Sequence, residues 1–288
     1  MAKLKVKNVI IRICHKENPQ GLDTLKKQLE AEGVIVIDSW QKQNFAFNHV
    51  AIERTLYLLE ETLFLTDDFT FCREARENWG FVTVYLHENN RQWDFSDIGY
   101  VIEGFEEFTA TDIDRIFRRY AKIPWSILET ERLKVREITV KDVDALYEIY
   151  KGASVTKYTN SLYENKEDEI AYTKNYIEKV YPFFGFGMWI VIEKESGKII
   201  GRAGFNFREG YDGMELGYVI GEHYQHKGYA TEVCTAIVQY VIEEFQTTAI
   251  RALTDQRNEA SVRVCEKLGM HHAGNVEIEG KVLEQYLL

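Results

Sequence analysis

Hydrophobic positions in the first 120 residues change period repeatedly along the chain. Short apolar, β-branched runs predict strands at residues 9–14, 34–37, 63–65, 81–86 and 100–102. Apolar residues at helical spacing predict helices at residues 22–29, near 50–59, at 71–79 and at 112–120. Gly33 and Gly80 each end a helix just before the next strand. This alternation predicts a parallel α/β sheet, in which the continuously apolar run 34–37 would be buried on both faces.

Residues 121–131, which contain Pro124, break this pattern and are expected to form a linker. A second unit over residues 132–288 then has a different order of elements. Strands are expected at residues 133–138, 188–193, 199–207, 214–220, 249–254 and 282–287. Helices are expected near residues 143–150, 170–181, 230–245 and 258–268. The second unit is therefore predicted to be α+β, with a mostly antiparallel beginning.

Length and charge agree with two units and narrow the function classes. The 288 residues exceed one domain of about 150 residues. Lys and Arg number 35 against 46 Asp and Glu, which gives a net charge of −11. Nucleic-acid binding over a broad surface is not expected, because it needs clustered basic residues. The acidic chain suits a soluble cytosolic protein, or one that binds a cationic substrate.

No membrane span or metal site is expected from the sequence. The most apolar stretch, residues 183–192, contains two glycines and is much shorter than the about 20 residues of a spanning helix. The four cysteines are scattered and form no CxxC pair, so neither a disulfide scaffold nor a zinc site is predicted. His271 and His272 have no third ligand at a known spacing and are expected in a loop or strand. A reduced, cytoplasmic setting follows from the cysteine pattern.

Residues 215–231, ELGYVIGEHYQHKGYAT, carry the most informative chemistry. A strand leads into the loop 225–230, and a helix begins at once. The first N–H groups of a helix lack partners and point, with the helix dipole, at an anion. Gly228 and the small Ala230 would let the backbone approach that anion closely, while Lys227 adds positive charge and Thr231 a hydroxyl. The loop is therefore predicted to bind phosphate.

This loop resembles the Q/R-x-x-G-x-G/A signature of the GNAT N-acetyltransferase superfamily, which cradles the pyrophosphate of acetyl-coenzyme A. Further matching segments are Ile200-Gly201-Arg202, Glu215-Leu216-Gly217-Tyr218, Asn258-Glu259-Ala260-Ser261 and Glu266-Lys267-Leu268-Gly269-Met270. The resemblance covers the whole second unit. It is most similar to the Rim-type branch, which is known for acetylating protein N-termini.

The resemblance implies cofactor roles for particular positions. The backbone of Tyr218, Val219 and Ile220 would pair with the pantetheine arm like an added strand. The pyrophosphate would be held by N–H groups of the loop residues Gln225, His226, Lys227, Gly228, Tyr229 and Ala230. Asn258 matches a residue that contacts pantetheine; alternatively, it caps the last helix.

The resemblance also implies candidates for the catalytic residues, and each of them has an alternative role. Glu215 lies where related enzymes often carry a general base; the alternative is a structural carboxylate bound to Arg202 or solvent. Many relatives place a general-acid Tyr seven residues after the Asn, where this chain has Cys265. The Cys265 thiol could donate the proton, or it could pack as a small buried hydrophobe. Ser261, four residues earlier on the same helix face, could instead donate through water.

In the first unit, residues 63–85 resemble the last motif region of haloacid dehalogenase-like phosphatases. Asp67 and Asp68 match the acidic pair that holds magnesium there, and they would lie at the carboxyl end of a strand. The nucleophile signature DxDx[TV] is absent: Asp38 is followed two residues later by Trp40. A degenerate domain with a structural or ligand-sensing role is therefore expected rather than an active phosphatase.

The resulting prediction is a two-domain, cytoplasmic N-acetyltransferase that uses acetyl-coenzyme A to acetylate a protein N-terminus or a small amine. Tyrosines and phenylalanines between residues 147 and 186 are expected in the acceptor cleft or in the core. Two alternatives stay open, a non-catalytic acyl-coenzyme A sensor and a phosphatase–acetyltransferase fusion. The sequence names neither the amine nor the oligomeric state, and a homodimer is among the alternatives.

Overall fold

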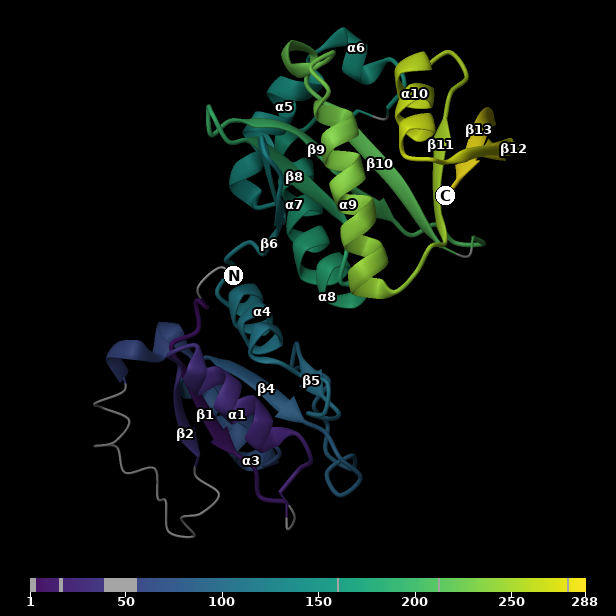
Figure 1. Cartoon of the computed structure of the whole chain (residues 1–288). Helices are drawn as coiled ribbons and strands as arrows, with labels where there is room; N and C mark the ends of the chain where they lie inside the picture. Colours follow the sequence, from purple (N-terminus) through teal and green to yellow (C-terminus); the bar gives the residue numbers. More distant parts are fainter. Residues whose placement is uncertain (1–3, 16–17, 39–55, 160, 212, 279) are drawn as a thin grey trace. The chain divides into compact units, whose positions relative to one another are not determined.

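The computed structural model describes residues 4–15, 18–38, 56–159, 161–211, 213–278 and 280–288. The chain divides into two compact units, Met1–Trp125 and Ser126–Leu288. Each unit has its own sheet (Figure 1). Among the helices of these ranges, none combines the length and apolar character needed to cross a membrane.

The first unit is built on a parallel five-stranded sheet of order β2-β1-β3-β4-β5. Its strands are β1 (Asn8–Arg12), β2 (Ile35–Asp38), β3 (Thr62–Thr66), β4 (Phe81–Tyr85) and β5 (Val101–Ile102). Its helices are α1 (Leu22–Ala31), the 3₁₀ helix η1 (Leu56–Glu61), α3 (Phe69–Asn78) and α4 (Ala110–Tyr120). Alternate side chains of β3 enter two cores: Leu63 and Leu65 pack with α1 and α4, and Phe64 packs with α3. The predicted parallel α/β sheet is confirmed.

Two details of this unit differ from the prediction or lie beyond it. The run 34–37 was expected to be buried on both faces, yet β2 is an edge strand of the described sheet and Ile35 is 57% exposed. An edge strand has a neighbour on one side only, so an apolar run alone does not make a strand central. Most of the helix expected near 50–59 lies outside the described residues, and η1 occupies its end.

The second unit contains an eight-stranded sheet of order β12-β13-β11-β10-β9-β8-β7-β6. Its strands are β6 (Ser126–Glu129), β7 (Leu133–Arg136), β8 (Met188–Glu193), β9 (Ile199–Asn206), β10 (Met214–Ile220), β11 (Ile250–Thr254), β12 (His271–Ile278) and β13 (Lys281–Leu287). All neighbouring strands are antiparallel except β10 and β11. The expected linker 121–131 is wrong in its second half, because β6 pairs with β7. His271 and His272 begin β12, a strand that the sequence analysis left open.

Helices cover both faces of this sheet. They are η2 (Val140–Asp142), α5 (Val143–Tyr150), α6 (Ala153–Thr156), α7 (Lys166–Asn175), the π turn η3 (Tyr176–Val180), α8 (Tyr181–Phe184), η4 (Glu222–Tyr224), α9 (Tyr229–Phe245) and α10 (Glu259–Lys267). Arg202 faces Tyr150 of α5, whereas the next residue of β9, Ala203, pairs with Tyr218, whose hydroxyl reaches Ser261 of α10. Because side chains alternate along a strand, α5 and α10 lie on opposite faces.

The site depends on a split between β10 and β11. Their parallel register runs from Met214↔Ile250 only to Leu216↔Ala252. Beyond Leu216, β10 continues to Ile220 along β9 on its other side. Four residues of β10 therefore have no strand partner on the β11 side, which opens the sheet.

Candidate active site

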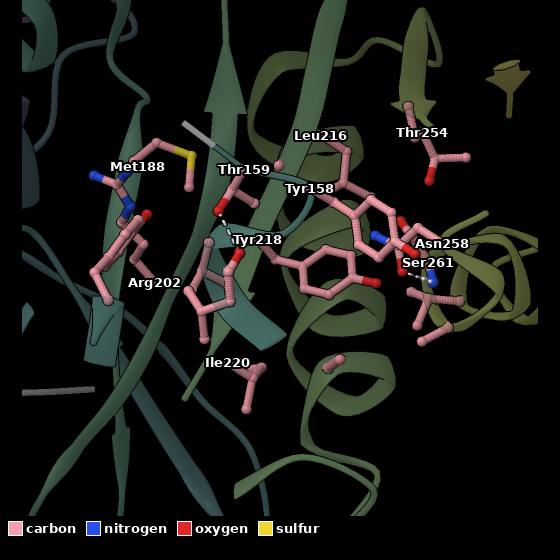
Figure 2. Close-up of a pocket in the computed structure, with 18 of the residues that line it drawn as sticks. Tyr158, Thr159, Met188, Arg202, Leu216, Tyr218, Ile220, Thr254, Asn258 and Ser261 are labelled. Atoms are coloured by element: carbon pink, nitrogen blue, oxygen red, sulfur yellow. Dashed lines mark hydrogen bonds between the residues drawn. The ribbon is translucent and has the colours of Figure 1, made fainter. Parts of the chain in front are cut away.

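A cleft of about 1050 Å³ occupies this split. Its walls come from β9, β10 and β11, from the segment around α5 to α7, and from the beginnings of α9 and α10. Figure 2 shows Tyr218 in the middle of the cleft, with Arg202 and Met188 toward one side and Asn258 and Ser261 toward the other. The cleft is therefore open to both faces of the sheet.

The open edge of β10 offers backbone groups for an extended ligand. The Met214 N–H donates toward β11, to Ala249 O, whereas the Gly221 N–H donates toward β9, to Ile200 O. Backbone direction alternates along a strand, so Tyr218 and Ile220 face the split and Val219 faces β9. The backbone of Tyr218, Val219 and Ile220 was expected to pair with pantetheine, but only Tyr218 and Ile220 direct backbone groups into the split. Val219 lines the cleft but directs its backbone toward β9.

Gln225 closes the end of this strand. Its Nε2 donates to Ile220 O at 2.9 Å, and its N–H donates to Glu222 O. Gln225 thus uses its backbone N–H and one of the two side-chain N–H groups within the protein. Among the described residues, the groups left free at the split are both backbone groups of Tyr218 and the N–H of Ile220.

The beginning of α9 has the geometry of an anion site. Gly228 takes the N-cap position with φ of 81°, and no side chain caps the helix. His226 is also left-handed, with φ of 61°. Within the described residues, the N–H groups of His226, Lys227 and Gly228 find no acceptor, and those of Tyr229, Ala230 and Thr231 begin the helix. Of these six residues, all except Lys227 line the cleft.

Residues before β7 hold this loop in place. Arg132 Nη1 donates to Lys227 O at 3.0 Å, and the guanidinium lies 4.4 Å from the centroid of the Tyr229 ring. The Tyr229 hydroxyl donates to Glu193 Oε1 at 2.6 Å. Glu232, in the first turn of α9, accepts from Arg132 Nε at 2.7 Å. The side chain of Tyr229 is therefore a support, and only its N–H is offered to a ligand.

Asn258 caps the beginning of α10, which was one of the two roles predicted for it from the sequence. Its Oδ1 accepts from the Ser261 N–H at 3.3 Å at the beginning of α10. Asn258 and Ser261 both line the cleft. The cap uses the side-chain oxygen, so the amide nitrogen of Asn258 is left for a ligand.

The Tyr218 side chain is a feature that the sequence analysis missed, because it considered only the backbone of this residue. The Tyr218 hydroxyl lies near Ser261 of α10, and both residues line the cleft. Burial raises the pKa of Tyr218 well above its usual value, so the phenol keeps its proton. The signal in the sequence was the Tyr of the matching segment Glu215-Leu216-Gly217-Tyr218, which lies on the strand expected to pair with pantetheine.

Cys265 packs in the core beneath this pair. It is 2% exposed and belongs to the main hydrophobic cluster. Burial raises the pKa of its thiol to about 11. The raised pKa keeps the thiol protonated, as it does the Tyr218 phenol. Cys265 also lines the cleft, and it is the apolar cluster around it, not the pKa, that favours the packing role.

Glu215 is held by two arginines. Arg208 donates to both of its carboxylate oxygens, from Nε at 3.0 Å and Nη2 at 3.1 Å, and Arg251 Nη2 donates to Oε2 at 2.8 Å. The structural alternative named Arg202 as its partner, but the partners are Arg208 and Arg251 instead. Both carboxylate oxygens are thus occupied by guanidinium donors, so the geometry favours the structural role over that of a base.

The α5 and α7 face of the cleft is rich in tyrosine. Its tyrosines are Tyr150, Tyr158, Tyr163, Tyr172 and Tyr176. Tyr158 donates to Arg257 O at 2.9 Å, and the Tyr176 hydroxyl accepts from the Met188 N–H at 2.7 Å. Phe183, also considered for the acceptor cleft, is 81% exposed outside it. The expectation of an aromatic cleft holds for these five tyrosines.

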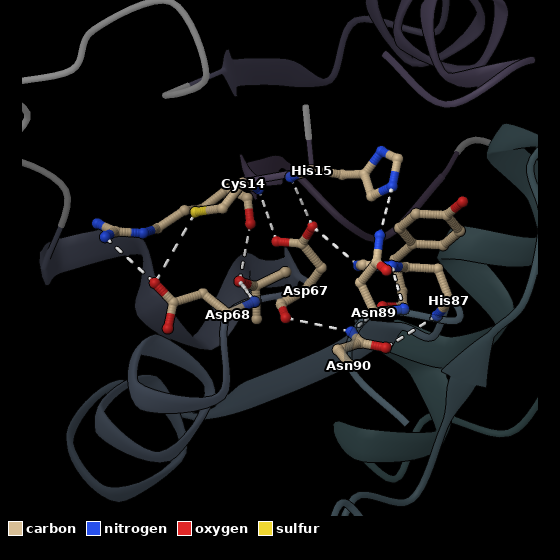
Figure 3. A network of polar contacts seen from close by, with 10 residues as sticks. Cys14, His15, Asp67, Asp68, His87, Asn89 and Asn90 are labelled. Atoms are coloured by element: carbon tan, nitrogen blue, oxygen red, sulfur yellow. Dashed lines mark hydrogen bonds and ion pairs between the residues drawn. The ribbon is translucent and has the colours of Figure 1, made fainter. Parts of the chain in front are cut away.

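In the first unit, Asp67 and Asp68 lie in a polar cluster at the carboxyl ends of β1, β3 and β4 (Figure 3). Asp67 accepts from the Cys14 N–H at 2.6 Å and the His15 N–H at 2.9 Å, and its Oδ2 lies 3.3 Å from His87 Nε2. Asp68 caps α3 and lies 3.3 Å from Arg12 Nη2.

Both carboxylates of this cluster are therefore occupied by protein groups. The described residues of the chain contain no group of three or more His, Cys, Asp or Glu that could hold a metal ion. The haloacid dehalogenase resemblance of this unit remains a prediction.

Comparisons with known proteins agree with the geometry of the second unit. The family profile described as "Acetyltransferase (GNAT) domain" matches residues 132–271. "Uncharacterized N-acetyltransferase YnaD" of Bacillus subtilis is 33% identical over 148 residues, which cover 51% of this chain and 84% of YnaD. "Uncharacterized N-acetyltransferase YoaA" of the same organism is 30% identical over 164 residues, which cover 56% of this chain and 88% of YoaA.

Among solved structures, the apo form of "RimL- Ribosomal L7/L12 alpha-N-protein acetyltransferase" superposes with a TM-score of 0.50 at 15% identity. The match covers 57% of this chain and 94% of that one, and it shows a shared fold. The chain belongs to the GNAT acetyltransferase family, and it is an acetyltransferase.

Proposed function

We propose that the chain transfers an acetyl group from acetyl-coenzyme A to a primary amine, by direct attack of the amine within a ternary complex. The observation that carries this proposal is the unpaired edge of β10 beside the uncapped beginning of α9. Tyr218 and Ile220 would hold the pantetheine arm, and the N–H groups of residues 226–231 would hold the pyrophosphate. Acetyl-coenzyme A supplies the acetyl group as an activated thioester.

The proton chemistry of the site favours an amine that is easily deprotonated. At pH 7, deprotonation costs an α-amine of pKa about 7.8 roughly 1 kcal/mol, and a lysine-like amine of pKa about 10.4 roughly 4.6 kcal/mol. Glu215 is engaged by Arg208 and Arg251, so we assign it the positioning of these arginines rather than proton transfer. The site then suits an acceptor that loses its proton to water.

Tyr218 is the proposed proton donor. Its hydroxyl is kept protonated by burial and lies near Ser261 in the cleft. In this assignment Tyr218 Oη gives its proton to the departing sulfur, with Ser261 orienting or relaying it. Cys265 would support the pair by packing.

The acceptor is either a protein N-terminus or a small amine. The RimL neighbour is described as an alpha-N-protein acetyltransferase, which supports an α-amine. The alternative of a non-catalytic sensor loses its main support, since Tyr218 can replace the acid that the Cys265 position lacks. A phosphatase fusion is disfavoured because Asp67 and Asp68 are engaged by protein groups.

The experiment is an assay of coenzyme A release with a panel of amines. Peptides with free N-termini, polyamines and aminoglycosides are tested side by side, with acetyl-coenzyme A affinity measured by calorimetry. Release with at least one amine is expected, and peptides should be the better class. Tight acetyl-coenzyme A binding without release from any amine would instead identify a sensor.

A further inference from the structure

Arg202, on β9, is a cation of the acceptor side of the cleft that no carboxylate neutralises. Among the residues that the structure describes, no acidic side chain lies within ion-pair distance of it. Its Nε–H is buried and has no acceptor there. Buried donors in proteins are nearly always paired, so an unpaired one in a cleft points to a ligand.

The surroundings of Arg202 strengthen its field. Its guanidinium carbon lies 5.0 Å from the centroid of the Tyr150 ring, and Tyr150 is 7% exposed. Apart from the neighbouring Arg202, the buried Tyr150 hydroxyl has no partner in the described ranges. Tyr172 and Tyr176 are also close enough for the Arg202 charge to lower their pKa, against the larger rise caused by burial. A guanidinium among aromatic rings, screened from water, attracts an anion more strongly than an exposed one.

The carboxylates of this side are engaged by groups other than Arg202. They are Glu215, which Arg208 and Arg251 hold, and Glu169, which accepts from the Tyr163 N–H at 3.1 Å. Arg208 and Arg251 do not line the cleft, whereas Arg202 does. Arg202 is therefore left with no ion-pair partner among the described residues, although the chain as a whole carries a charge of −11. A polyamine or aminoglycoside would meet repulsion here.

We propose that Arg202 binds a carboxylate of the acceptor, so that the acceptor class is a primary amine with a carboxylate a few bonds from its nitrogen. This inference rests on the proposed function and names its substrate class. The planar guanidinium matches a carboxylate through two parallel hydrogen bonds, and the Tyr150 hydroxyl supplies a further donor. Two sources share this chemistry: a free amino acid, and a peptide whose first residue is acidic.

The test compares amines with and without the carboxylate. Rates are expressed per neutral amine, because an α-carboxylate also raises the pKa of the amine. Alanine is paired with alaninamide, and an amidated tripeptide beginning with aspartate is paired with the same tripeptide beginning with asparagine; spermidine is added. In one pair, the carboxylate-bearing amine should have a kcat/KM about tenfold to a hundredfold higher, as expected for a hydrogen bond to a charged group. The pair that shows this difference identifies the acceptor as a free amino acid or as a peptide with an acidic first residue.

Arg202→Met should abolish this preference while leaving calorimetric acetyl-coenzyme A affinity unchanged, and Arg202→Lys should keep part of it. Lys198→Met is the matched control, because Lys198 is exposed in the turn before β9 and lies outside the cleft. Lys198→Met also removes one positive charge, and it should retain the full preference for the amine that bears a carboxylate. If Arg202→Met does not fold, the kcat/KM ratios of the wild-type chain and of Arg202→Lys still show whether the acceptor carboxylate is recognised.

Equal or faster acetylation of alaninamide, the asparagine peptide or spermidine would overturn this inference alone, since acetyl transfer would still be shown. An unchanged ratio in Arg202→Met would overturn it as well. Absence of coenzyme A release with every amine, despite acetyl-coenzyme A binding, would overturn the proposed function and this inference together.

Discussion

At the scale of single residues, the proton donor that we propose comes from another element than the resemblance implied. The position seven residues after Asn258 holds a buried cysteine, and we propose that Tyr218 on β10 supplies the phenol instead. The sequence could show that the expected tyrosine is missing at residue 265. It could not show that the Tyr218 side chain enters the cleft, because the direction of a side chain across a sheet depends on strand register. For the same reason, the sequence placed Glu215 beside Arg202, whereas the register Glu215↔Arg251 brings a different arginine to it.

Removal of the Tyr218 hydroxyl should slow acetyl transfer. Tyr218→Phe keeps the ring and is expected to lower kcat by about 10²-fold, the low end for a general acid, since a thiol leaves readily. If Ser261 relays the same proton, Ser261→Ala and the double variant should show losses that do not add. Steady-state rates of the three variants, with acetyl-coenzyme A affinity measured by calorimetry, check this.

The pH profile separates this role from a structural one. Because burial raises the pKa of Tyr218, its proton is retained at alkaline pH, and the wild-type rate should rise up to the pKa of the amine without falling at pH 9–10. Cys265→Ala is the control: its thiol, with a pKa of about 11, packs in the core, so the variant should lose stability and little rate. A Cys265→Ala rate as low as that of Tyr218→Phe would contradict the assignment.

At the scale of elements, the loop motif was readable because its chemistry is local. A strand, a left-handed glycine and a helix without a side-chain cap follow one another within 15 residues of sequence. The backbone donors of the predicted anion site all belong to this segment, although Arg132 and Glu193 support it from elsewhere. Elements defined by distant pairing were harder. The edge positions of β2 and β6 depend on which strands lie beside them, and β12 is recognised only through its pairing with β13.

The left-handed glycine gives a prediction with a matched control. Gly228→Ala should weaken acetyl-coenzyme A binding about tenfold, or roughly 1.4 kcal/mol, because the added methyl keeps the pyrophosphate from the backbone. Gly197→Ala, in the turn between β8 and β9, places a methyl on a backbone of similar φ, 66° against 81°, with open space around it. Both variants should lose similar stability, and calorimetric titration should show weaker binding for Gly228→Ala alone. Equal affinities of the two variants would exclude the loop from the cofactor site.

At the scale of the whole molecule, the division into two units could be predicted, because the period of the hydrophobic pattern changes where the second sheet begins. Each unit has its own core. The function of the first unit could not be read in the same way. Asp67 and Asp68 follow β3 as a ligand site would require, but backbone N–H groups and the side chains of Arg12 and His87 occupy them. Such occupation arises from tertiary packing and leaves no trace in the spacing of the two residues.

This occupation predicts that Asp67 stabilises the first unit and performs no chemistry. Asp67→Ala would leave the Cys14 and His15 N–H groups without an acceptor, at a cost of about 1–3 kcal/mol each where they are buried. The variant of the full chain should unfold at lower denaturant concentration, with unchanged acetyl-coenzyme A affinity. Asp97→Ala removes an exposed carboxylate that pairs with Arg73 and Arg76, and it should change stability little.

The same pair of variants tests for a hidden phosphatase. With p-nitrophenyl phosphate and magnesium, the wild-type chain is expected to release no phosphate above background, because the DxDx[TV] nucleophile is missing and Arg12 already places a positive charge beside Asp68. Magnesium-dependent release that disappears in Asp67→Ala and persists in Asp97→Ala would mean that the carboxylate is exchanged between protein donors and a metal ion. In that case the cluster at the ends of β1, β3 and β4 would be an active site, and its hydrogen bonds would describe only the state without metal.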